Sequence, residues 1–171
     1  MISMIKRLKF ADLFTIGNFV CGLLAIIFAI NMDFLVSIIL ILCAVLFDTL
    51  DGKVARYFKQ ENEMGKELDS LSDIISFGIW PSIFGYQQGL NSNFAIAILL
   101  FFSVCGMLRL ARFNITDVKH FEGIPITANG LIFPAIFFWF WFNNAFFNDY
   151  MLIVYVLMGL FMVSSIRIRK I

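Results

Sequence analysis

The sequence predicts an all-α integral membrane protein, a bundle of six transmembrane helices in one domain over residues 1–171. Three observations predict it. Hydrophobic residues make up 61% of the chain and charged residues 15%, whereas a soluble domain carries about 25% charged residues. The apolar residues fall into six runs near the length of about 20 residues that a spanning helix needs. All thirteen Lys and Arg residues lie on one side of a six-span arrangement. This composition excludes a disordered chain and a soluble domain, and a net charge of +1 gives no field that would attract nucleic acid.

The six expected spans cover, in chain order, residues 13–30, 34–55, 67–86, 94–112, 128–142 and 150–166. The connections 31–33 and 143–149 are short and rich in Asn and Asp, and 87–93 is a polar turn in which Gly89 breaks the helix. Pro81 and Pro134 fall inside spans, where membrane bundles tolerate proline. No small-residue cleavage site follows Ile30, so we expect the first run to be a retained span and not a signal peptide.

The basic residues predict the orientation. They precede the first span, flank the connections between spans two and three and between spans four and five, and follow span six. Short cytoplasmic loops carry the excess of Lys and Arg. Both termini and the even-numbered connections are therefore expected in the cytoplasm. The cysteines Cys21, Cys43 and Cys105 lie inside apolar runs without metal-ligand spacing and are expected to be buried free thiols.

Four aspartates form the most informative pattern. Asp48 and Asp51 are three residues apart, and Asp69 and Asp73 are four apart, so each pair shares one helix face. Asp48 directly follows an apolar run, and acids at such depth are costly and usually mark a site. A bound cation would relieve their repulsion. Carboxylates suit Mg²⁺, Mn²⁺ or Ca²⁺, and the lone His120 lies in a loop, so no set suits zinc.

A plainer interpretation of the same acids remains open. They could be solvated helix ends that form salt bridges with neighbouring basic side chains, namely Lys53, Arg56 or Lys66. The small residues among them favour a ligand. Gly52 follows Asp51 inside a helical pattern, where glycine costs about 1 kcal/mol relative to alanine. Ala55 lies three residues further on. Small residues beside carboxylates leave room for a flat ligand, although ordinary close helix packing also uses them.

The full pattern, DxxDGxxAR-x8-GxxxDxxxD, resembles the signature of the CDP-alcohol phosphatidyltransferase family. Its eight fixed positions are Asp48, Asp51, Gly52, Ala55, Arg56, Gly65, Asp69 and Asp73. The resemblance implies transfer of a phosphatidyl-type group from a CDP-linked lipid to an alcohol, with release of CMP. It implies one or two divalent ions held by Asp48, Asp51, Asp69 and Asp73. It further implies a cytidine pocket of Gly52, Ala55 and Gly65, supported by Asp51 and Arg56, with Asp73 as the general base.

Three further stretches, DSLSDIISFGIWPS, LRLARFN and FEGIPIT, resemble the phosphatidylserine synthase branch of that family. Arg109 and Arg112 share a helix face and could bind a phosphate or a carboxylate, or could anchor the helix by snorkelling. Thr15 and Asn18 could hydrogen-bond the nucleotide or a neighbouring helix. Lys119 could meet an anionic substrate or be solvated.

These observations predict an enzyme that transfers a phosphatidyl group from CDP-diacylglycerol or CDP-archaeol to the L-serine hydroxyl, by direct displacement at the cytoplasmic face. Two alternatives remain. The same chemistry could act on glycerol 3-phosphate or an inositol derivative. The aspartates could instead form the translocation site of a small cation transporter, although the acids cluster at one face. Members of the family are often homodimers, and the apolar outer faces permit one.

Overall fold

The computed structural model describes residues 9–59, 62–115, 121–143, 150–164 and 167–168. Its elements are α2 (Asp12–Ile30), α3 (Phe34–Tyr57), α4 (Glu63–Asp73), the π-helix η1 (Ile74–Ile79), α5 (Trp80–Gln87), α6 (Asn93–Ile115), β1 (Phe121–Glu122), the 3₁₀ helix η2 (Ile126–Ala128), α7 (Asn129–Phe142), α8 (Tyr150–Val163) and β2 (Arg167–Ile168). The predicted helical class is confirmed. The sequence did not predict the antiparallel pairing of β1 with β2, because a ladder of two residues leaves no alternating pattern.

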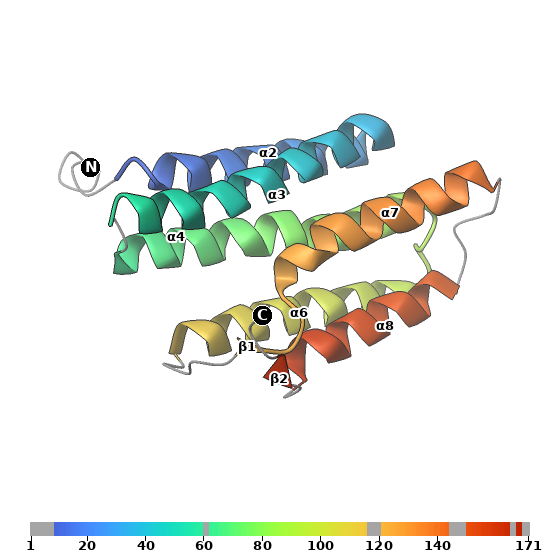
Figure 1. The fold of residues 1–171 in the computed structure, drawn as a ribbon. Coiled ribbons are helices and arrows are strands. Elements are labelled where there is room, and N and C mark those ends of the chain that lie inside the picture. Colours follow the sequence, from blue (N-terminus) through green and yellow to red (C-terminus); the bar gives the residue numbers. More distant parts are fainter. Residues whose placement is uncertain (1–8, 60–61, 116–120, 144–149, 165–166, 169–171) are drawn as a thin grey trace.

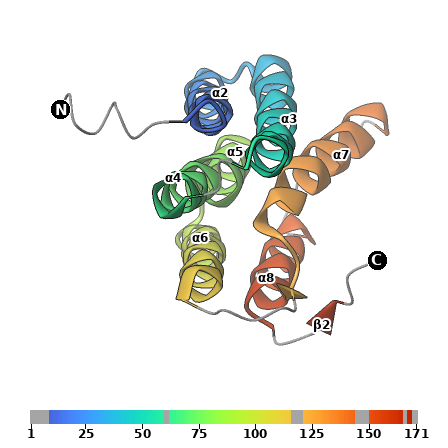
Figure 2. The ribbon, with the colours of Figure 1, turned by 60° about the vertical axis from the view of Figure 1, so that its left-hand side comes forward.

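The helices run side by side along one direction (Figure 1). In the turned view, α2 and α3 lie on one side of the bundle and α6 and α8 on the other, with α4 and α5 between them and α7 flanking (Figure 2). α2 packs on both α3 and α4, α6 packs on α8, and η1 packs on both α2 and α6. The segment from α4 to α5 therefore connects the two sides of the bundle.

Within the residues that the structure describes, three helices are long and apolar enough to cross a membrane, namely α2, α3 and α6. The third expected span is formed by α4, η1 and α5 in succession, and its start is polar because it carries the acids. α7 and α8 have 14 residues each, shorter than the roughly 20 that span a bilayer without local thinning. The expected ends of α2 and α3 agree within a few residues. The count of six spans stays a prediction.

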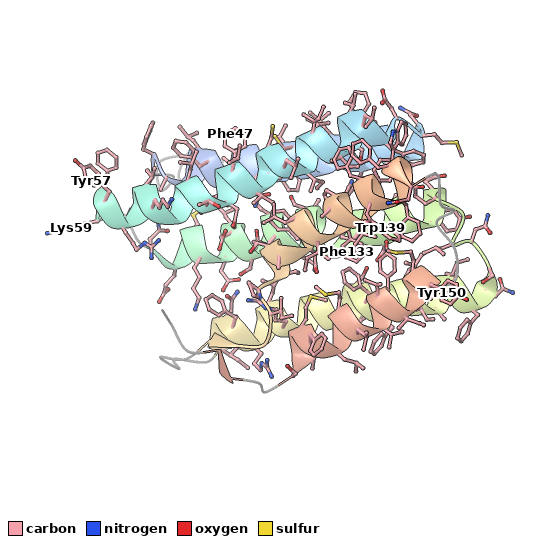
Figure 3. The ribbon with its side chains drawn as sticks, turned by 45° about the vertical axis from the view of Figure 1, so that its right-hand side comes forward. Phe47, Tyr57, Lys59, Phe133, Trp139 and Tyr150 are labelled. Carbon is pink, nitrogen blue, oxygen red and sulfur yellow. The ribbon has the colours of Figure 1, made fainter. Side chains whose placement is uncertain are left out.

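Aromatic side chains fill the centre of the bundle. Tyr155 is fully buried and stacks on Phe133, with ring centroids 4.6 Å apart. Its hydroxyl donates to the carbonyl oxygen of Pro81 at 2.6 Å, which satisfies the buried polar end of the side chain. Trp139, by contrast, is 60% exposed (Figure 3). Cys21, Cys43 and Cys105 are free thiols, as predicted, but only Cys105 is buried, and Cys21 and Cys43 are half-buried.

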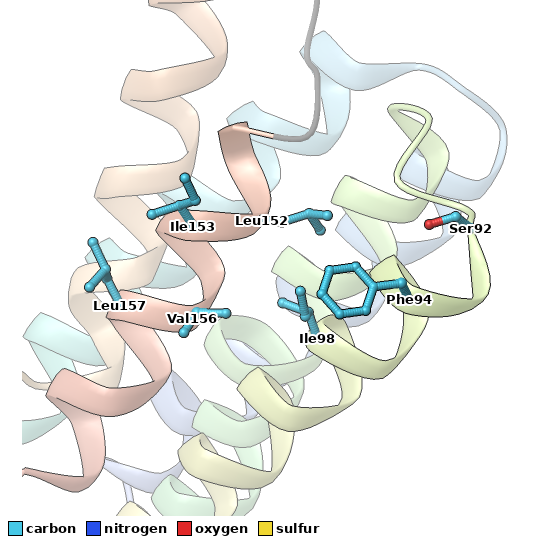
Figure 4. Close-up of a pocket in the computed structure, with 7 residues that line it drawn as sticks. All are labelled: Ser92, Phe94, Ile98, Leu152, Ile153, Val156 and Leu157. Atoms are coloured by element: carbon cyan, nitrogen blue, oxygen red, sulfur yellow. The ribbon is translucent and has the colours of Figure 1, made fainter.

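The two ends of the bundle are marked by exposed side chains. Tyr57 and Lys59 lie at one end and Tyr150 at the opposite end (Figure 3). Aromatic residues gather at the interfaces of a bilayer, so these positions fit a bundle that crosses it. An apolar hollow of about 430 Å³ lies toward the Tyr150 end, between α6 and α8 (Figure 4). Its lining residues are Ser92, Phe94, Ile98, Leu152, Ile153, Val156 and Leu157. This hollow lacks charged groups and is separate from the aspartates.

Gly22 allows α2 to approach η1 closely. A Cβ atom there would lie 2.9 Å from the backbone Cα of Ser76, which is closer than real Cβ contacts come. At Gly17, on the same helix, a Cβ would instead meet the Phe47 ring at 3.1 Å, and a side chain can turn away. The contact of α2 with η1 therefore depends on glycine at position 22.

We expect Gly22→Ala to lower the free energy of unfolding by about 1–3 kcal/mol relative to Gly17→Ala, the usual cost of overpacking. Both variants gain the same helix propensity, so their difference reports the backbone clash alone. Thermal unfolding in one detergent measures it. Equal stabilities of the two variants would show that η1 moves aside without cost.

Candidate active site

Four aspartates from two helices meet at one place in the bundle. Asp48 and Asp51 lie on the last turns of α3, while Asp69 and Asp73 lie on α4. Carboxylate oxygens of Asp48, Asp51 and Asp69 lie within 4.8 Å of one another. Asp73 interacts electrostatically with Asp48 and Asp69. The two pairs, each on one helix face as the spacing predicted, therefore meet in the fold.

The cluster has the chemistry of a site for a divalent cation. Its three close side chains offer oxygen ligands, which suit Mg²⁺, Mn²⁺ or Ca²⁺. The buried Oδ1 atom of Asp69 has no hydrogen-bond partner among the described residues, so this oxygen is left for a ligand. Asp73 lies beside the group of three and outside it. Its predicted place among the metal ligands stays a prediction.

Helix α2 contacts both acid pairs. The Thr15 hydroxyl donates to Oδ2 of Asp51 at 2.9 Å. The Asn18 amide nitrogen donates to Oδ1 of Asp73 at 3.0 Å. The two donors are 4% and 0% exposed, so both bonds are shielded from water. Each donor thus reaches a carboxylate on a different helix.

A cavity of about 660 Å³ opens beside the cluster between α2, α3 and α4. Its lining residues are Ala11, Asp12, Thr15, Asp51, Gly52, Ala55, Arg56, Asn62, Glu63, Gly65, Lys66, Asp69 and Phe113. All the residues expected to bind the nucleotide are among them except Asn18, which is fully buried against Asp73. The volume is in the range of small-molecule and cofactor pockets.

The two glycines of the motif have different surroundings. A Cβ at Gly52 would meet only the end of the Arg56 side chain, at 4.0 Å, so this position faces open cavity. A Cβ at Gly65 would lie 2.8 Å from Oδ1 of Asp12 and 3.2 Å from the Asn62 amide. Glycine at 65 therefore makes room for protein side chains, whereas glycine at 52 leaves space for a ligand.

Sequence reasoning missed Asp12, Asn62 and Phe113 in the cavity wall. Asp12 is 3% exposed, and its Oδ2 accepts the backbone N–H of Lys9 at 2.8 Å. The Asn62 side chain accepts the Gly65 N–H at 2.8 Å and caps α4. An asparagine before a helical pattern is a recognisable cap signal. Nothing in the sequence marks Phe113.

The two arginines of α6 have different partners. Arg109 is 8% exposed, interacts electrostatically with Asp73 and Asp48, and has no hydrogen-bond partner at Nε among the described residues. Arg112 donates to the carbonyl oxygens of Val163 and Ser164 at 3.1 and 3.2 Å, at the end of α8. Arg109 therefore interacts with Asp73 and Asp48, whereas Arg112 hydrogen-bonds the carboxyl end of α8. Lys119 and His120 lie outside the described residues.

Comparison with known proteins agrees with this arrangement. The family of CDP-alcohol phosphatidyltransferases matches residues 8–166. The chain is 39% identical to the CDP-diacylglycerol–serine O-phosphatidyltransferase of Methanocaldococcus jannaschii, across 99% of this chain and 78% of that protein. It is 40% identical to the enzyme of that name in Bacillus subtilis, across 72% of each chain. It is 42% identical to the archaetidylserine synthase of Methanothermobacter thermautotrophicus, across 67% of this chain and 52% of that protein.

The family match covers the four aspartates, the cavity and the helices that hold them. Together with similarity over nearly the whole chain, it shows that the protein is a phospholipid-synthesising enzyme that belongs to the CDP-alcohol phosphatidyltransferase family.

Proposed function

We propose that the enzyme transfers the phosphatidyl group of a CDP-linked lipid to the hydroxyl of L-serine and releases CMP. The relatives named for this reaction come from archaea and bacteria and align over most of the chain. The observation that carries the choice of acceptor is the buried Arg109 beside Asp73, with an N–H that has no partner among the described residues. In this proposal Arg109 binds the carboxylate of serine, and the neighbouring Asp73 accepts the proton of its hydroxyl.

The donor is a lipid that carries CDP, either CDP-diacylglycerol or CDP-archaeol. Relatives named for each of the two lipid classes match the chain. Both donors share the cytidine and the diphosphate, which we assign to the cavity wall at Gly52, Ala55 and Arg56. The open space at Gly52 is where a flat base could lie against the backbone.

We propose six spans with both termini in the cytoplasm and the aspartates at the cytoplasmic face. The apolar helices α7 and α8 supply the fifth and sixth spans, and the α4–η1–α5 segment supplies the third. The distribution of Lys and Arg supports this orientation. CDP-lipid head groups and serine would then reach the site from the cytoplasm. A homodimer stays a prediction.

We assign the divalent ion, Mg²⁺ or Mn²⁺, to Asp48, Asp51 and Asp69, with Asp73 at its edge. The unpartnered oxygen of Asp69 and the closeness of the three carboxylates support this assignment. A bound ion of this kind would neutralise the diphosphate and stabilise the departing CMP. The protein contributes the fixed spacing of the ligands, held by α2.

Asp73 accepts the proton of the serine hydroxyl as attack proceeds. The serine oxygen forms a bond with the phosphorus of the phosphatidyl group, and the bond from that phosphorus to the bridging oxygen of CMP breaks. Phosphoryl transfer needs alignment and charge stabilisation more than covalent chemistry. The cysteines are free thiols inside apolar runs, and the described residues offer no Ser–His or Cys–His pair. A direct displacement is therefore the simplest route.

A CMP-release assay with CDP-diacylglycerol, Mn²⁺ or Mg²⁺ and a panel of alcohols tests the proposal. We expect release with L-serine and little with glycerol 3-phosphate or inositol phosphate, since the described site offers Arg109 as its buried cation. Release with glycerol 3-phosphate and none with serine would overturn the choice of acceptor. Ion flux into proteoliposomes in the absence of CDP-lipid would favour a transporter.

Variants at two of the acids should separate metal binding from proton transfer. Asp69→Ala removes a carboxylate of the close group, so the Mn²⁺ concentration for half activation should rise by about tenfold or more. Asp73→Asn cannot take the proton, so turnover should fall by about 10²–10⁴-fold while binding of CDP-lipid stays within about twofold. Metal titration of Asp69→Ala that matches wild type, or a fully active Asp73→Asn, would contradict the respective role.

Arg109→Lys should raise the KM for serine by about tenfold or more, because an ammonium group cannot form the paired hydrogen bonds of a guanidinium with a carboxylate. The KM for CDP-lipid should change little. Arg112→Lys is the matched control on the same helix face. It loses bonds to the end of α8 and should lower thermal stability without this change in the KM for serine. A serine KM unchanged in Arg109→Lys would remove Arg109 from the acceptor site.

A further inference from the structure

Asn18 occupies a position where its polar side chain costs stability. It is fully buried, and its Oδ1 atom has no hydrogen-bond partner among the described residues. A buried acceptor without a partner loses its hydration and gains nothing in return. An apolar side chain of similar size would avoid this loss. An amide at this position therefore needs a compensating role, and its hydrogen bond to Asp73 supplies one.

The amide of Asn18 donates from Nδ2 to Oδ1 of Asp73 at 3.0 Å. Asp48, Asp69 and Arg109 also interact electrostatically with Asp73. The amide bond holds one oxygen toward α2 and so orients the carboxylate. An amide neither gains nor loses a proton under working conditions, so it orients the carboxylate without competing for the proton that Asp73 must accept.

Asn18 is not needed to hold α2 against its neighbours. The Ser72 hydroxyl donates to the backbone oxygen of Thr15 at 3.2 Å, and the Ser76 hydroxyl donates to the backbone oxygen of Asn18 at 3.2 Å. Gly22 lets α2 approach η1 one turn further along. These backbone contacts do not involve the Asn18 side chain. Its effect on the acid pair can therefore be separated from the packing of the helices.

We propose that Asn18 is a positioning residue for the transfer reaction, which sets the orientation of the Asp73 carboxylate toward the acceptor hydroxyl. This inference rests on the function proposed above. It replaces the expectation of a nucleotide contact at position 18 with a role behind the base. The geometry also distinguishes Asn18 from Thr15, which bonds Asp51 and lines the cavity.

The test compares Asn18→Leu with wild type in the CMP-release assay with serine. Leucine fills the space and removes both the donor and the unpartnered oxygen. We expect kcat to fall by about 10- to 100-fold, in keeping with a poorly aligned base, while the KM for CDP-lipid and the Mn²⁺ requirement stay within about twofold. The thermal unfolding temperature should stay close to that of wild type or rise.

Ser76→Ala is the matched control, because it removes a buried hydrogen bond to Asn18 itself and touches none of the acids. Its kcat should stay within about twofold of wild type. An Asn18→Leu protein with wild-type kcat, or one that loses CDP-lipid affinity and not turnover, would overturn the inference. If Asn18→Leu unfolds, Asn18→Ala decides: it is smaller and also lacks the donor, so a wild-type kcat there also overturns the inference. Absence of serine-dependent release in wild type would instead refute the proposed function.

Discussion

Repulsion among four carboxylates gathered from two helices is the constraint on which the rest of this structure depends. Three of them lie within 4.8 Å of one another, and like charges at such separation oppose folding unless a cation or hydrogen-bond donors compensate. The bundle does not bring the acids together by packing α3 tightly on α4. Both helices pack on α2 instead, which leaves a cavity between them and places two donors behind the acids. The same arrangement therefore makes the space for a ligand and holds the groups that would bind it.

The π-helix η1 connects the helix that carries Asp69 and Asp73 to the remainder of the bundle. It begins directly after Asp73 and packs on both α2 and α6, and π-helical turns frequently occur at functional sites. On one side, Ser76 meets the backbone of α2. On the other, Ser103 of α6 donates to the carbonyl oxygen of Gly78 at 3.0 Å. Asp73 thus directly precedes a segment that packs on both α2 and α6, and Arg109 comes from α6.

The sequence predicted those features that depend on local periodicity. Spacings of three and four residues place Asp48 with Asp51 and Asp69 with Asp73 on shared helix faces, whatever the tertiary structure is. It could not predict contacts that depend on how helices approach one another. The glycine motif suggested space for a ligand at both glycines, yet the space at Gly65 is taken by Asp12 from a distant part of the chain. The bonds from Arg112 to the end of α8 likewise follow from tertiary packing.

Two unpaired polar atoms lie where the chemistry is proposed. Among the described residues, Asp69 Oδ1 and Arg109 Nε are buried without hydrogen-bond partners, and both residues interact electrostatically with Asp73. Native interiors tolerate few such atoms, because each forfeits its hydration. A cation would give Asp69 Oδ1 a partner, and the carboxylate of the acceptor substrate would give Arg109 Nε one. Ligands that bind the folded state alone raise its stability, so a cation and an acceptor bound at these two atoms would restore stability that the free protein gives up.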